Sequence, residues 1–112
     1  MREETQGDAF ILTLKGEFDL SSAPAVRTAL DSAVDGGTRR IVIDMLDCNF
    51  VDSTGLGVLL HTAKRIEAVG GMALVCVDEQ IRRLLGLTMI DRTIPVFATR
   101  EDALANVGAV PQ

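Results

Sequence analysis

The chain alternates short apolar runs with amphipathic segments of helical period, and this alternation constrains its fold more than any other feature. The apolar runs at residues 10–14, 41–43 and 72–77 contain no charged residue, and a short extended piece at residues 17–20 follows the first. Strands that alternate with helices form right-handed crossovers and a mostly parallel sheet. The unbroken run at 72–77 fits such a sheet, because a strand covered on both faces has no polar side.

The helices are placed by their capping residues and by apolar residues that recur every three or four positions. The first helix is expected to begin at residues 21–24, where Ser21 and Ser22 can accept bonds from free backbone N–H groups and Pro24 suits the first turn. Gly36 and Gly37 are expected to end it, because glycine easily adopts the left-handed backbone conformation that caps a helix at its C-terminus. The remaining elements are a second helix after Asp52, a third at residues 81–85, an edge strand at 96–97 and a final short helix at 101–107.

These elements predict a single α/β domain over residues 1–112, with a mixed, mostly parallel sheet of four to five strands and about four helices. A chain of 112 residues has the length of one domain, and its apolar fraction of 47% is enough for a core. We expect an ordered core at about residues 8–107 and loose ends on both sides of it.

The charge and the cysteine content exclude several classes of protein. A formal net charge of −5 opposes attraction to nucleic acid or to an anionic membrane surface. The first eight residues are polar, which predicts no signal peptide, and charges interrupt every apolar stretch before it could span a bilayer. We therefore expect a cytoplasmic protein, in which Cys48 and Cys76 are buried thiols without metal-site spacing. We expect neither a metal ion nor a cofactor.

The most informative segment runs from residue 51 to residue 57, Val-Asp-Ser-Thr-Gly-Leu-Gly. It brings hydroxyl groups to the first turn of a helix at the C-terminal end of a strand, where parallel sheets tend to carry their sites. Two interpretations stay open from the residues alone. Asp52, Ser53 and Thr54 are ordinary capping residues. A phosphate on Ser53 would also be tolerated, because a helix N-terminus offers free N–H groups and a positive dipole end.

Gly57 and His61 lie on the same side of this predicted helix as Ser53. A glycine inside a helix costs about 1 kcal/mol relative to alanine, so its presence needs a reason. Either a partner protein approaches the bare backbone at Gly57, or the glycine relieves crowding against the loop after Asp19. His61 is the only histidine and has no serine, cysteine or second histidine nearby in sequence, which favours a surface position over catalysis.

At these residues the sequence resembles the STAS domain, and in particular the stand-alone anti-sigma factor antagonists, or anti-anti-sigma factors, of bacterial sporulation and general stress regulation. The resemblance extends from about residue 10 to about residue 104. It is carried by five segments: residues 16–19 (Gly-Glu-Phe-Asp), 22–24 (Ser-Ala-Pro), 50–59 (Phe-Val-Asp-Ser-Thr-Gly-Leu-Gly-Val-Leu), 70–77 (Gly-Gly and the strand that follows) and 81–85 (Ile-Arg-Arg-Leu-Leu).

The resemblance implies a regulatory phosphoprotein that takes part in partner switching and is not an enzyme. Its partner would be an anti-sigma factor that is itself an ATP-using serine kinase. The unphosphorylated antagonist binds this kinase and frees a sigma factor for transcription. Phosphorylation at Ser53 releases the kinase, and a metal-dependent serine phosphatase restores the antagonist. Residues 44–49 differ in detail from close relatives, which leaves the particular partner open.

The resemblance also assigns roles around the phosphorylation site. Asp19 and Asp52 match acidic positions that interact with a partner or position the acceptor. Thr54 matches a Ser/Thr position whose role is capping or hydrogen bonding, or that of a minor phosphate acceptor. The predicted partner-binding residues are Asp19, Asp52, Ser53, Thr54, Gly55, Gly57 and His61.

Two other classes of function fit the sequence less well. A STAS accessory subunit of a membrane transport complex would dock on the transporter's ATPase, but the intact pair Asp52 and Ser53 favours the antagonist. An enzyme would need a phosphate-cradling glycine loop or a nucleophile with its base, and the sequence contains neither. A phosphate-accepting response regulator would need a lysine near the last strand, and no lysine follows Lys64.

Overall fold

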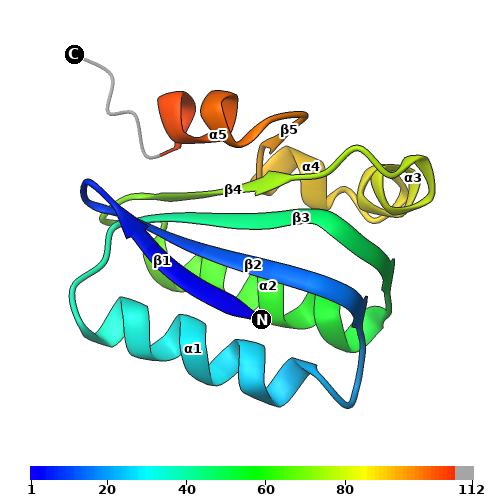
Figure 1. Cartoon of the computed structure of the whole chain (residues 1–112), viewed down its shortest axis with the longest axis horizontal. Coiled ribbons are helices and arrows are strands. Elements are labelled where there is room, and N and C mark those ends of the chain that lie inside the picture. Colours follow the sequence, from blue (N-terminus) through cyan, green and yellow to red (C-terminus); the bar gives the residue numbers. More distant parts are fainter. Residues whose placement is uncertain (108–112) are drawn as a thin grey trace.

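The computed structural model describes residues 1–107 and contains one five-stranded sheet with helices on both faces (Figure 1). The sheet order is β1-β2-β3-β4-β5, in which β1 is antiparallel to β2 and the other neighbours are parallel. The strands are β1 (Arg2–Gln6), β2 (Ala9–Phe18), β3 (Arg40–Val51), β4 (Gly71–Val75) and β5 (Val96–Phe97). The helices are α1 (Ala23–Asp35), α2 (Ser53–Ile66), α3 (Glu79–Leu87), α4 (Ile90–Thr93) and α5 (Arg100–Asn106). The predicted α/β architecture is confirmed.

The two faces of the sheet are covered unequally. α1 and α2 lie together against one face, whereas the short α5 lies against the other (Figure 1). Successive side chains along the central strands point to opposite faces of the sheet. Leu12 and Ile43 join the large apolar cluster under α1 and α2. Ile11 and Val42 join the small apolar cluster under α5. α3 and α4 complete the large cluster. Both faces of the central strands are therefore apolar, as their sequences predict.

The prediction of a loose N-terminus does not hold. The segment before Asp8 forms β1, and the chain turns at Gly7 (φ 62°). Every residue of β1 then pairs with β2. β1 is an edge strand, and four of its five residues are exposed. Because neither face of this strand is buried, its sequence has no apolar alternation to reveal it. The C-terminal tail, also expected to be loose, lies outside the described residues.

β2 and β3 are longer than their apolar runs, and this extra length positions the candidate site. β2 continues through Gly16, whose φ of 73° accommodates irregular pairing, and the register with β3 shifts on either side of that residue. The paired strands reach Phe18 and Val51, whereas the pairing of β3 with β4 ends at Asp44 and Val75. The segments that follow β2 and β3 therefore emerge side by side.

The described part of the chain gives three further facts. Cys48 and Cys76 are buried free thiols, as predicted, and burial raises the pKa of each thiol. Within residues 1–107, no helix has the length and apolarity needed to cross a membrane. Over the same residues, no group of three or more histidine, cysteine or acidic side chains is arranged to hold a metal ion.

Candidate functional site

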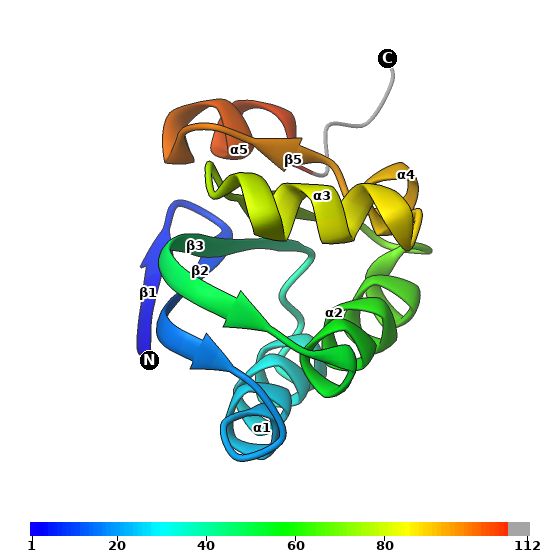
Figure 2. The same ribbon diagram turned by 90° about the vertical axis from the view of Figure 1, so that its right-hand side faces the viewer.

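The candidate site lies where β2 and β3 end, at the C-terminal edge of the sheet. Figure 2 shows the arrowheads of the two strands next to each other, leading into α1 and α2. Phe18 and Val51 are register partners, and the Asp52 amide donates a hydrogen bond to the Phe18 carbonyl oxygen at 3.2 Å. The loop at residues 19–22 and the first turn of α2 are thereby held against each other.

Asp52 joins these two segments through its carboxylate. The residue has an extended backbone and caps α2, with Oδ1 accepting the Gly55 amide at 2.9 Å. Its other oxygen, Oδ2, accepts the Leu20 amide from the neighbouring loop at 3.0 Å. A carboxylate that satisfies two backbone donors on different segments fixes their relative position. Asp52 therefore ties the loop at residues 19–22 to the start of α2.

Ser53 is the first residue of α2, and its side chain is exposed. The neighbouring Thr54 is half-buried, so its hydroxyl is less accessible to another protein. α2 is 14 residues long, so the positive end of a full helix dipole lies beside the Ser53 hydroxyl. This position therefore offers an accessible nucleophilic oxygen at a helix end whose dipole favours added negative charge.

Asp19 organises its own loop. Its Oδ1 accepts the Ser21 amide at 3.0 Å and the Ser21 hydroxyl at 2.8 Å. The bond from the Ser21 hydroxyl is the main reason that the pKa of Asp19 is below its usual range. The prediction that the serine hydroxyls cap α1 is wrong for Ser22. Its Oγ accepts the Asp19 amide and donates to the Glu17 carbonyl oxygen, both at 3.0 Å, and makes no capping bond to α1.

The two glycines of the motif have different environments. Gly55 is buried, and a Cβ there would lie 2.7 Å from the Phe18 carbonyl oxygen, so close packing of α2 on β2 requires glycine. Gly55 therefore does not lie on the accessible surface expected of a partner-binding residue. Gly57 is exposed, and a Cβ there would meet no atom within 4 Å. This excludes crowding against the loop after Asp19 as the reason for Gly57.

His61 is not close to Ser53. It lies eight residues further along α2, which corresponds to about 12 Å of helix axis. Its ring faces α1, with Nε2 3.5 Å from Asp31 Oδ1. Arg65 donates to the same Asp31 oxygen at 3.0 Å and to Asp35 Oδ1 at 2.6 Å, and these bonds raise the pKa of Arg65. His61 thus lies in a polar network between α1 and α2, in which Arg27 is also 3.4 Å from its Nε2.

Two exposed apolar side chains at this edge were not predicted as site residues. Leu20 is 72% exposed in the loop held by Asp52, and Phe50 is 49% exposed near the end of β3. A leucine between Asp19 and Ser21 in a polar turn was the available signal for the first. Phe50 adjoins the buried Val51, and its sequence alone does not distinguish it from a core residue.

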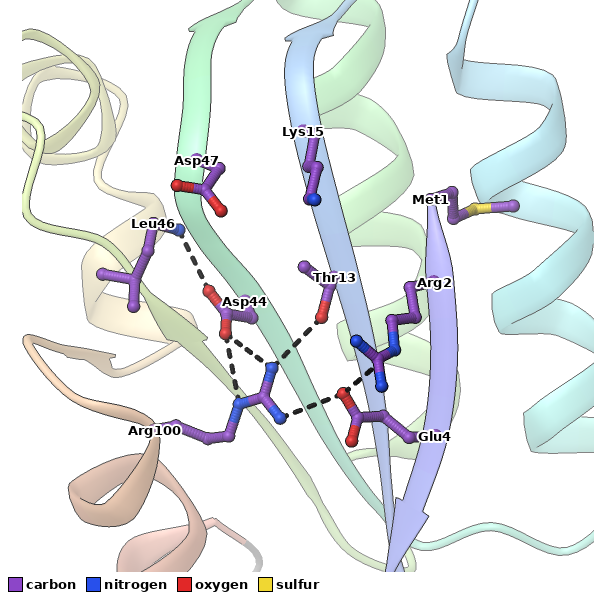
Figure 3. Close-up of a pocket in the computed structure, with 9 residues that line it drawn as sticks. All are labelled: Met1, Arg2, Glu4, Thr13, Lys15, Asp44, Leu46, Asp47 and Arg100. Atoms are coloured by element: carbon purple, nitrogen blue, oxygen red, sulfur yellow. Dashed lines mark hydrogen bonds and ion pairs between the residues drawn. The ribbon is translucent and has the colours of Figure 1, made fainter.

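A hollow of about 420 Å³ lies on the face of the sheet that carries α5 (Figure 3). Its central side chain is Arg100, which donates to Asp44 Oδ2 at 2.8 Å, to Glu4 Oε1 at 3.0 Å and to the Thr13 hydroxyl at 3.2 Å. The bond to Asp44 is the main reason that the pKa of Arg100 is raised. These polar groups satisfy one another and connect β1, β2, β3 and α5, so the cluster has a structural role.

The chain is similar to known regulatory proteins over almost its whole length. The model of the STAS domain family matches residues 1–103. The anti-sigma F factor antagonist of Paenibacillus polymyxa is 32% identical over 102 residues, which covers 89% of this chain and 87% of that protein. The anti-sigma-F factor antagonist RsfB of Mycobacterium tuberculosis is 32% identical over 97 residues, covering 87% and 80%. Both names describe regulatory binding proteins rather than enzymes.

The similarity extends to solved structures. The crystal structure of an anti-sigma factor antagonist from Mycobacterium paratuberculosis superimposes with a TM-score of 0.89 at 30% sequence identity. The match covers 95% of this chain and 91% of that one. The order of strands and helices described above is therefore that of a solved antagonist structure.

Proposed function

This chain belongs to the STAS domain family, and on that premise we propose that it is an anti-sigma factor antagonist switched by phosphorylation at Ser53. The unphosphorylated form binds a kinase-type anti-sigma factor in the cytoplasm and frees a sigma factor. The kinase transfers phosphate from ATP to Ser53, and the phosphorylated form dissociates. A metal-dependent serine phosphatase returns the chain to its binding state. The identity of the kinase decides whether the switch serves sporulation or stress response.

The observation that carries this proposal is the exposed Ser53 side chain at the first position of α2. A kinase must reach the acceptor hydroxyl, and Ser53 is more exposed than Thr54. Phosphate adds about 1.5 to 2 negative charges at neutral pH. The helix dipole favours such a charge by roughly 0.3–1 kcal/mol at an exposed site, which allows the fold to persist while the surface changes.

Gly57 supports a protein partner at this surface. It lies one helical turn after Ser53 on the exposed side of α2, and its lack of a side chain is not required by packing within the domain. A bare backbone allows another protein to approach α2 closely, beside the acceptor hydroxyl. We propose that Asp19, Asp52, Ser53, Thr54 and Gly57 form this surface, with the two aspartates acting chiefly by positioning. We leave Gly55 and His61 out of it.

The test is incubation of the purified chain with its anti-sigma factor kinase and ATP, followed by mass spectrometry of the modified peptide. We expect one phosphate on Ser53, none in Ser53→Ala, and an unchanged extent of modification in Ser32→Ala, a control that removes an exposed serine of α1 outside this surface. Phosphate found only at other residues would contradict the mechanism. Co-purification with a transporter ATPase, unaffected by any change at Ser53, would favour a transport-complex subunit instead.

A further inference from the structure

We infer that Leu20 is an apolar anchor of the partner-binding surface, and that Asp52 is the residue that positions it. The inference rests on the proposed function and adds to it a contact residue outside the phosphorylation motif. It also specifies the chemistry of the partner, which must present an apolar pocket of about leucine size beside the cleft that receives the Ser53 hydroxyl.

The first support is the exposure of Leu20 next to the site. Its side chain is 72% exposed, although an exposed leucine gains nothing in the isolated domain. The bond between Asp52 Oδ2 and the Leu20 amide places this residue at the start of α2, close to Ser53. Phe50, 49% exposed near the end of β3, adds apolar surface at the same edge of the sheet. Apolar side chains in such a position can be buried only by another molecule.

The second support is the order of the loop that carries Leu20. Two bonds connect residues before Leu20 with residues after it: Asp19 Oδ1 accepts the Ser21 amide, and the Ser22 hydroxyl donates to the Glu17 carbonyl oxygen. The Asp52 carboxylate then fixes the Leu20 amide itself at 3.0 Å. A loop already held in one conformation loses little entropy on binding, so most of the gain from burying its leucine appears as affinity.

The third support is that partner binding through Leu20 would depend on whether Ser53 is phosphorylated. When Leu20 enters an apolar pocket, the neighbouring surface around Ser53 loses contact with water. A phosphate on Ser53 would then have to be desolvated beside an apolar contact and next to the Asp52 carboxylate, which is strongly unfavourable unless the partner supplies compensating charges. Burial of Leu20 therefore makes binding sensitive to the state of Ser53.

The test compares Leu20→Ala with Leu87→Ala in binding to an anti-sigma factor kinase that the wild-type chain binds. Leu87 is 73% exposed near the end of α3, so the control removes an equally exposed leucine from another element. We expect Leu20→Ala to weaken binding by ten- to a hundredfold in calorimetry, and Leu87→Ala by less than twofold. Both variants should keep the wild-type circular dichroism and thermal midpoint, because neither side chain is buried.

A second pair of variants tests the positioning role of Asp52. Asparagine still caps a helix, so Asp52→Asn keeps one accepting oxygen for Gly55 but cannot also accept the Leu20 amide. Asp78→Asn is the matched control, because Asp78 caps α3 through the Ile81 amide at 3.0 Å. We expect faster hydrogen exchange of the Leu20 amide and at least fivefold weaker binding in Asp52→Asn, and neither effect in Asp78→Asn.

The outcomes separate this inference from the proposed function. If the wild-type chain binds the kinase and Leu20→Ala binds it equally well, the anchor is disproved and the antagonist function stands. If Asp52→Asn leaves the exchange of the Leu20 amide unchanged, the positioning role is disproved. If the wild-type chain binds no anti-sigma factor kinase, the proposed function fails and the inference fails with it.

Discussion

Arg100 and Asp44 form the most extensive polar contact between α5 and the sheet. Arg100 donates from both Nε and Nη2 to the same oxygen of Asp44, at 3.1 and 2.8 Å. The Asp44 side chain is only 8% exposed, whereas that of Arg100 is 31% exposed. The pair therefore places a largely buried carboxylate beneath a partly solvated cation, on the face of the sheet opposite α1 and α2 (Figure 3).

Removal of Arg100 should destabilise the domain more than removal of an arginine from its surface. Arg100→Ala leaves the Asp44 carboxylate buried without its cation, which costs about 3–5 kcal/mol for a fully buried pair. Because Arg100 is partly exposed, water replaces some of the lost contact, and we expect a loss of about 2 kcal/mol. Urea unfolding measures this. Arg83→Ala, at an exposed position of α3, should change stability by less than about 0.5 kcal/mol.

The glycines at 55 and 57 should respond in opposite directions to substitution by alanine. At Gly55 the new Cβ would lie 2.7 Å from the Phe18 carbonyl oxygen, and such overpacking costs about 1–3 kcal/mol. At Gly57 the Cβ meets open space, so alanine should stabilise α2 by up to about 1 kcal/mol. Thermal unfolding of the two variants measures both effects. A stabilised Gly57→Ala variant with weakened kinase binding would show that this glycine is kept for a partner.

Asp19 should titrate at lower pH than an ordinary aspartate, chiefly because the Ser21 hydroxyl donates to its carboxylate. Ser21→Ala removes this donor, so the pKa of Asp19 should rise toward its usual value of about 3.9. Carboxyl chemical shifts followed by NMR report this directly. Since the folded-state pKa is the lower one, the stabilisation of the loop is present above about pH 4 and is lost as the pH falls through that folded-state value. An unchanged pKa in Ser21→Ala would contradict the assigned cause.

Met89 has a left-handed backbone, with a φ of 62°, at the junction of α3 and α4. A side chain in this conformation costs roughly 1 kcal/mol, a penalty that glycine does not incur. The Met89 side chain is 57% exposed, so little packing is lost on its removal. We expect Met89→Gly to stabilise the domain by about 0.5 kcal/mol in urea unfolding. Leu87→Gly, two residues earlier at the end of α3, should instead destabilise it by about 1 kcal/mol.

The sequence predicted the parts of the fold that have a period. The central strands and the two long helices each bury a regular set of apolar residues, and these patterns placed the sheet and its parallel direction. The start of α2 was placed by its capping residue, Asp52. β1 has four exposed residues of five, so its pairing with β2 leaves no trace in the order of polar and apolar residues. β1 is therefore recognised only from its pairing with β2 in the structure.

The site was predicted where it depends on neighbours in sequence and missed where it depends on contacts across the fold. Asp52 next to Ser53 indicated a helix cap, but the bond from Asp52 to the Leu20 amide joins residues 32 positions apart. The reason for Gly57 stayed open until its surroundings were known. The sequence predicted His61 on the same helical side as Ser53, yet its ring lies against Asp31 and Arg27 of α1. Such preferences are set by side chains on separate elements.

Substitution of Ser53 should separate the stability of the domain from its binding. Ser53→Asp places a negative charge at the first position of α2, where the helix dipole stabilises it. The free energy of unfolding, measured in urea, should therefore change by less than about 0.5 kcal/mol. Ser53→Ala should bind the anti-sigma factor kinase with wild-type affinity, because it preserves a small neutral surface. Ser53→Asp should bind about a hundredfold more weakly, a difference of about 3 kcal/mol. If Ser53→Asp loses binding while its stability is unchanged, misfolding is excluded as the cause of the loss. Full binding by Ser53→Asp would refute a switch based on charge.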